Sequence, residues 1–235
     1  MNTYFTKEEK GKEVLLFLHG WGCDGSVFGP LASHLNSTNY LVDLWGFGKS
    51  DTPLAPWSVA DYAHQLKNFC DQQGLARFSI VCHSFGARVA VVFASMYPNM
   101  VQKLLIVGGA GLKRASIKRF CAVAKYKLLK SLAKLGVYKG KLPQGSADYQ
   151  SASGVMKQTF VKVVNQDLSR YAKKIACPTL LVWGRCDTAT PLWMGRKYNR
   201  LIRDSALIVL DGDHFVFLQR ATQFSLIANA FLEGN

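Results

Sequence analysis

Residues 81–87 read Val81-Cys82-His83-Ser84-Phe85-Gly86-Ala87 and join an apolar run to a segment of helical spacing with almost no loop. A serine at so tight a strand-to-helix turn is held in a strained conformation with its hydroxyl exposed. Small residues two positions before and after the serine let the strand and the helix approach each other. Gly86 meets this requirement, while Cys82 stands where glycine is more usual. The stretch predicts a reactive serine, Ser84, at the end of a buried strand.

Outward from this turn, short apolar runs alternate with segments of helical spacing. The runs predict strands over 14–18, 40–44, 78–82, 103–107, 179–183 and 206–210. The intervening segments predict helices over 27–35, 59–73, 87–97, 192–202 and 219–231. This alternation implies crossover units, and therefore an α/β fold whose mostly parallel central sheet carries helices on both faces.

The alternation breaks once, between Leu112 and Lys174, where the sequence has no strand pattern and only helix-like segments broken by glycines and Pro143. We interpret this part as a helical cap inserted over the carboxyl ends of the strands. The predicted organisation is a core of residues 1–111 and 175–235 and a cap of residues 112–174.

Candidate partners for Ser84 follow two later strands. A serine hydroxyl is a poor nucleophile at neutral pH, so it needs an adjacent base that is itself oriented by a carboxylate. Asp187 and His214 each stand just past a predicted strand, in the order Ser, Asp, His. Each has a simpler explanation when taken alone, since Asp187 also suits a helix cap and a single His is often a surface residue. Their order and their common position at strand ends favour a catalytic triad.

The first strong strand ends in His19-Gly20-Trp21-Gly22. Its glycines allow the backbone N–H of Trp21 to turn toward the serine. Together with the N–H of Phe85, it would form the paired donors that hold a developing oxyanion. We predict Trp21 and Phe85 as the oxyanion-hole residues.

At this point the chain resembles the α/β-hydrolase family over nearly its whole length. The matching pieces are HGWG (19–22), DLWGFGKSD (43–51), CHSFGA (82–87), LLVWGRCDTATP (180–191) and DGDHF (211–215). The resemblance implies that Ser84 is the nucleophile, His214 the general base and Asp187 its orienting acid, with Trp21 and Phe85 as the oxyanion donors. It gives Gly46 and Gly48 a structural role in a turn.

The chain departs from the family pattern at three places. Cys82 replaces a glycine, Trp45 stands where proline is common, and the first strands are trimmed to little more than Asn2–Thr6. His83, Cys82 and Cys186 are interpreted as packing residues. The resemblance extends to single-domain carboxylesterases with a helical cap.

Composition narrows the class of protein. Of 235 residues, 49% are hydrophobic and 19% charged, which is typical of a folded chain with a sizeable core. No apolar run approaches the ~18 residues of a membrane span, and the polar residues 1–13 do not predict a secretory signal. The six cysteines lack CxxC or CxxH spacing, so we expect reduced thiols, a cytoplasmic location and no metal site.

The positive charge is concentrated in one segment. The net charge is +14, and residues 112–141 contain ten basic residues and no Asp or Glu. No helix-turn-helix, zinc-finger or aromatic-basic signature accompanies this charge, so nucleic-acid binding is not predicted. Two explanations of this pattern are equally good. The segment over 117–135 is a cap helix whose cationic face is solvated, or that face binds an anionic partner. Such a partner would be a membrane surface, an acidic acyl carrier or a small carboxylated substrate.

The predicted function is that of a serine hydrolase that cleaves small-molecule carboxylic esters through an acyl-enzyme on Ser84. No cofactor is expected. Hydrolysis of a C–C bond, a lactone or a thioester by the same residues stays open, as does a non-catalytic ligand-binding module.

Overall fold

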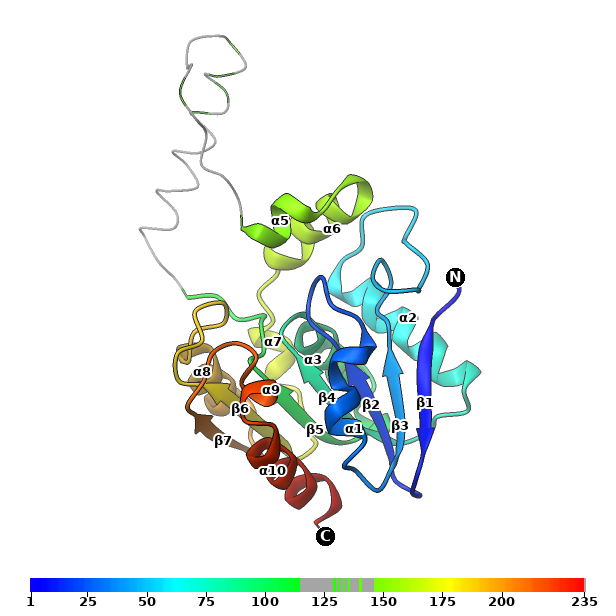
Figure 1. Ribbon diagram of the computed structural model, residues 1–235. Coiled ribbons are helices and arrows are strands. Elements are labelled where there is room, and N and C mark those ends of the chain that lie inside the picture. The colour runs from blue at the N-terminus through cyan, green and yellow to red at the C-terminus, as the bar shows by residue number, and fades with distance from the viewer. Residues whose placement is uncertain are drawn as a thin grey trace.

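The computed structural model describes residues 1–114 and 146–234, and between them the single positions 129, 131, 133, 135 and 140. Strands among these residues form one seven-stranded sheet of order β1-β3-β2-β4-β5-β6-β7 (Figure 1). Only β1 is antiparallel to its neighbour; the other pairs are parallel. The strands are β1 (Phe5–Glu9), β2 (Val14–Leu18), β3 (Thr38–Val42), β4 (Phe78–His83), β5 (Val101–Val107), β6 (Thr179–Gly184) and β7 (Ser205–Leu210). The predicted mostly parallel α/β sheet is confirmed.

Helices cover both faces of the sheet because its central strands are apolar on both sides. In β2, Leu16 and Leu18 belong to one buried cluster, whereas Leu15 and Phe17 belong to the other. The first cluster includes side chains of α2 (Val59–Gln72), α3 (Phe85–Met96) and α8 (Trp193–Leu201). The second includes side chains of α1 (Gly29–Ala32), α9 (Val216–Gln219) and α10 (Ala221–Glu233). Figure 1 shows α1 and α10 in front of the sheet and α2 and α3 behind it. The strand alternation thus produces a core on each face.

Local chemistry sets the helix ends. Helix α2 begins at a capping box, in which the Ser58 hydroxyl accepts from the Asp61 N–H and the Asp61 carboxylate accepts from the Ser58 N–H. The predicted helix over 27–35 is instead a short 3-10 turn (Gly25–Phe28) followed by the single turn α1, and Pro30 stands at the start of α1. Because proline has no N–H to donate, it cannot extend a preceding helix.

Two further boundaries differ from prediction. Strand β3 ends at Val42, not at residue 44, because the Asp43 carboxylate accepts from the N–H groups of Gly25 and Lys49 and fixes a turn there. The predicted helix over 219–231 is observed as α10, which begins two residues later at Ala221, and the separate turn α9 precedes it. Arg220, between the two, has a φ of −120° and a ψ of 42°, which are not helical. The N-terminal strand, β1, lies at 5–9, slightly beyond the expected 2–6.

Three helices of the predicted cap fall in the described residues: α5 (Ala147–Ser151), α6 (Gly154–Val164) and α7 (Ser169–Ala172). Figure 1 shows α5 and α6 at the edge of the sheet where the parallel strands end. Most of the basic segment and the predicted 117–135 helix lie outside the described residues, and the domain boundaries remain a prediction. Among the described residues, every helix is too short or too polar to cross a bilayer.

Candidate active site

Ser84 occupies the turn between β4 and α3 without an intervening loop. Its φ of 49° and ψ of −107° make it the only non-glycine residue of the described chain with a positive φ. A conformation this rare in an L-residue costs of order 1–3 kcal/mol and clusters at functional sites. A side chain at Gly86 would collide with the carbonyl groups of Leu18 and His19 on the adjoining strand end, so glycine is required there. Cys82 is fully buried and fits the turn.

His214 joins Ser84 and Asp187 through its two ring nitrogens. The His214 Nε2 atom lies 2.9 Å from the Ser84 hydroxyl, and Nδ1 lies 2.9 Å from Asp187 Oδ2. Since the carboxylate can only accept, Nδ1 carries the proton and Nε2 faces the hydroxyl with its lone pair. The structure therefore brings together the three residues that the sequence placed on separate strand ends.

Thr190 fixes the Asp187 carboxylate. The sequence analysis did not predict this role. Its backbone N–H donates to Asp187 Oδ1 at 2.8 Å, and its hydroxyl lies 2.7 Å from Oδ2 and 2.8 Å from the Gly108 carbonyl oxygen. Burial alone would raise the pKa of Asp187, but the hydrogen bonds from His214 and Thr190 outweigh it and hold the pKa below its usual value. The carboxylate thus stays ionised beside the imidazole. The Asp-x-x-Thr spacing of residues 187–190 could have indicated that Thr190 bonds to the Asp187 carboxylate.

Trp21 and Phe85, the two predicted oxyanion donors, line the same cavity as Ser84. Phe85 is the first residue of α3, where no carbonyl of the same helix can accept from its N–H. Gly20, which precedes Trp21, packs so closely that an added Cβ would lie 3.4 Å from Ser84 Cβ. No group in the described part of the chain accepts from the N–H of Trp21 or Phe85. Both donors are therefore available to a ligand.

His19 orients the Trp21 N–H, a role that the sequence did not reveal. Its Nε2 accepts from the Leu44 N–H at 2.8 Å, so the proton is on Nδ1, which donates to the Gly20 carbonyl at 2.7 Å. The Gly20 carbonyl and the Trp21 N–H belong to one planar trans peptide and point in opposite directions. Fixing the carbonyl on the buried side therefore directs the N–H away from it.

His83 does more than fill space, in contrast to the packing role predicted for it. Its ring is 1% exposed and its centroid lies 4.6 Å from that of His214. Nε2 lies 2.9 Å from the His214 carbonyl oxygen, whereas Nδ1 is buried without a partner. Burial, followed by the neighbouring His214, lowers the pKa of His83 to about 3. A neutral His83 must therefore donate from Nε2 to the backbone of His214.

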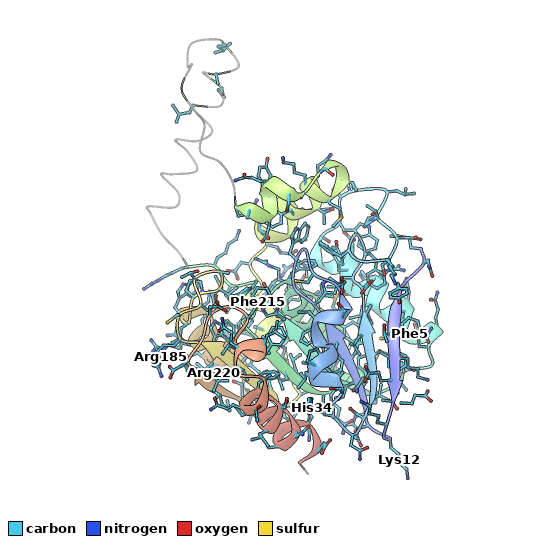
Figure 2. The ribbon with its side chains drawn as sticks, viewed as in Figure 1. Phe5, Lys12, His34, Arg185, Phe215 and Arg220 are labelled. Carbon is cyan, nitrogen blue, oxygen red and sulfur yellow. The ribbon has the colours of Figure 1, made fainter. Side chains whose placement is uncertain are left out.

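A cavity of about 400 Å³ opens onto Ser84 and His214, which is within the usual size range of small-molecule sites. Phe215, labelled in Figure 2, borders it beside α9. Among the described residues, the lining carries two charged groups, Arg88 and Asp148. The Arg88 guanidinium donates to the carbonyls of Val163 and Gln166 and so connects α3 to the end of α6. The remaining lining is mostly apolar.

The other sequence predictions concern turns, thiols and metals. Gly46 and Gly48 have φ values of 89° and 53°, as expected of a turn that needs glycine. Trp45 is buried, and its indole N–H donates to Thr3. The cysteines of the described chain are free thiols, Cys186 being exposed. Within residues 1–114 and 146–234, no group of three or more His, Cys, Asp or Glu side chains is placed to hold a metal ion.

Comparisons with known proteins agree with this architecture. The chain is 29% identical over 226 residues to a 2-hydroxy-6-oxononadienedioate/2-hydroxy-6-oxononatrienedioate hydrolase of Paraburkholderia phymatum, covering 84% of this chain and 78% of the relative. An esterase from Exiguobacterium antarcticum superposes with a TM-score of 0.79 at 20% identity, covering 99% of this chain and 96% of the esterase. A meta-cleavage product hydrolase from Pseudomonas fluorescens gives a TM-score of 0.74 at 20% identity, with coverages of 99% and 95%. These structural similarities concern the fold.

A match to the family description "Alpha/beta hydrolase family" extends over residues 15–225, which include the serine turn and both later strand ends. The chain belongs to the alpha/beta hydrolase family.

Proposed function

We propose that this protein is a serine hydrolase that cleaves carboxylic esters through an acyl-enzyme on Ser84. One observation carries the proposal: the chain of hydrogen bonds from the Ser84 hydroxyl through His214 to Asp187, with Ser84 held at a positive φ. Nucleophile, base and orienting carboxylate have the mutual reach that acyl transfer requires.

The reaction follows from the positions of the protons. His214 Nε2 takes the proton of the Ser84 hydroxyl as its oxygen attacks the ester carbonyl. Asp187 stabilises the imidazolium that forms, and the N–H groups of Trp21 and Phe85 hold the oxyanion. Donors of this kind contribute a few kcal/mol each. His214 then gives its proton to the departing alcohol, and water attacks the acyl-enzyme by the same route.

Hydrolysis of a C–C bond is the second candidate, because the matched Paraburkholderia relative carries the name of such a hydrolase. The substrate in that name is a dianion. The charged groups described in the catalytic cavity are a carboxylate, Asp148, and a guanidinium, Arg88, that already donates to two carbonyls. This balance of charge favours an ester whose part inside the cavity carries little net charge.

The test is hydrolysis of p-nitrophenyl esters by the wild-type protein and by Ser84→Ala. We expect turnover by the wild type and its loss in Ser84→Ala, with the thermal unfolding midpoint unchanged. A folded wild type that cleaves a dienedioate but no ester would support the C–C reaction. One that cleaves neither would support a ligand-binding module.

We also propose that the enzyme is cytoplasmic. The basic residues of the segment 112–141 would attract an anionic partner. Exposed charges are screened beyond about 8–10 Å at physiological ionic strength. Rates on an anionic ester or on a carrier-bound acyl group should therefore fall as salt rises, while rates on a neutral ester should not. Equal salt dependence for neutral and anionic esters would leave the segment with a solvated role only.

A further inference from the structure

Two cavities of the described structure meet at Trp21. The first is the catalytic cavity of about 400 Å³. The second, of about 500 Å³, is lined by Gly46 and Phe47 in the turn after β3, by Thr52, and by residues 151–156 between α5 and α6. Among the described residues, Trp21 is the only one that lines both cavities. Trp21 therefore borders both cavities.

The indole is held at this position by aromatic contacts on both sides. On the side of the second cavity, its ring centroid lies 4.7 Å from that of Phe47. On the side of the catalytic cavity, it lies 5.1 Å from Phe85 and 4.9 Å from Phe160. These edge contacts are the favoured geometry for aromatic pairs. The Trp21 indole thus contacts side chains from the linings of both cavities.

The two cavities differ in charge. The catalytic cavity includes Asp148 and Arg88, whereas the described lining of the second cavity contains no ionisable side chain. Its walls combine apolar groups with hydroxyls. Burying a charge without a partner is costly, so such a cavity suits an uncharged chain.

We propose that the second cavity is a distal substrate subsite for an uncharged, mainly aliphatic chain, and that the Trp21 side chain sets substrate length by separating this subsite from Ser84. This inference rests on the proposed ester hydrolysis. With the indole in the observed position, the enzyme accepts chains that end within the catalytic cavity. When the indole is displaced, a chain acylating Ser84 extends past position 21 into the second cavity.

The test is the profile of kcat/KM against acyl length for p-nitrophenyl esters from acetate to decanoate. In Trp21→Ala, we expect the optimum to move to longer chains. Each methylene that becomes buried contributes about fourfold, so three or four of them should raise the ratio of octanoate to acetate kcat/KM by about 100-fold. The ratio is used because the acetate rate itself depends on the oxyanion donors.

A filling substitution identifies the space that the longer chain uses. Ala152 lines the second cavity but not the catalytic one, so Ala152→Phe added to Trp21→Ala should return the ratio to the wild-type value. Val161→Phe is the matched control, since Val161 is exposed on α6 and lines neither cavity. It should leave the ratio of the Trp21→Ala variant unchanged.

An unchanged profile of kcat/KM against acyl length in Trp21→Ala would refute the subsite. A profile that shifts in Trp21→Ala but does not return when Ala152→Phe is added would also refute it. If Trp21→Ala does not fold, Trp21→Leu provides the same comparison with a smaller expected shift. Absence of turnover with every ester in the folded wild type would instead refute the proposed function, which distinguishes the two failures.

Discussion

Removing the His83 imidazole should slow catalysis without unfolding the protein. His83 Nε2 lies 2.9 Å from the His214 carbonyl oxygen, and the two rings lie 4.6 Å apart. In His83→Leu that carbonyl loses its donor and His214 loses a ring contact. We therefore expect His214 to occupy its aligned position beside Ser84 for a smaller fraction of the time.

The magnitude follows from the lost hydrogen bond. A part-buried acceptor left without its donor costs about 1–3 kcal/mol. If this cost appears as misalignment of His214, kcat should fall by about 5- to 150-fold, with little change in KM because the loss acts on the chemical step. Gln carries an amide N–H at a reach similar to that of Nε2, so His83→Gln should recover most of the lost kcat.

The assay is steady-state hydrolysis of p-nitrophenyl acetate by wild type, His83→Leu and His83→Gln, with thermal unfolding of each. Equal loss of kcat in both variants would mean that the shape of the ring, and not its hydrogen bond, is what matters. An unchanged kcat in a folded His83→Leu would refute the positioning role altogether.

Three further predictions concern the site and its supports. Asp187→Asn should lower kcat by about 10³- to 10⁴-fold in stopped-flow or steady-state assays, because an amide cannot stabilise the imidazolium; a loss below tenfold would contradict this. Gly86→Ala should destabilise the fold by about 1–3 kcal/mol or more in chemical denaturation, since its Cβ meets two carbonyl groups, whereas Gly29→Ala, with no atom within 4 Å of the added Cβ, should not. Burial lowers the pKa of both His83, to about 3, and His19 in the folded protein. Below about pH 6.5, these two histidines are therefore protonated in the unfolded chain but stay neutral in the folded protein. The free energy of unfolding should then fall as pH drops from 6.5 toward 4, by up to about 1.4 kcal/mol per pH unit from His83, and pH-dependent urea unfolding of His83→Gln should show a shallower decline.

The sheet could be predicted from the sequence because each central strand is apolar on both faces. Runs such as Val14–Leu18 and Thr179–Trp183 have few alternatives to a buried parallel strand, and the observed β2 and β6 begin where predicted. Strand ends were harder. β3 was misplaced by two residues because its end depends on Asp43, whose carboxylate bonds come from residues 25 and 49. Such tertiary bonds leave no periodic signal.

In the candidate site, too, some residues could be predicted from the sequence and others could not. Ser84, Asp187 and His214 could be placed because each follows a predicted strand, and the carboxyl ends of parallel strands meet at one edge. The contacts that hold these residues in position could not be predicted from the sequence. His19 and His83 act through backbone carbonyls of Gly20 and His214, and a backbone acceptor has no sequence signature. The local pattern therefore made His83 look like a packing residue.

Reaction with a fluorophosphonate, followed by peptide mass spectrometry, tests most directly whether Ser84 is the nucleophile. We predict a single adduct per chain, located on Ser84, absent in Ser84→Ala and much slower to form in His214→Gln. A folded wild-type protein that stays unlabelled, or that carries its adduct on another residue, would contradict the central claim.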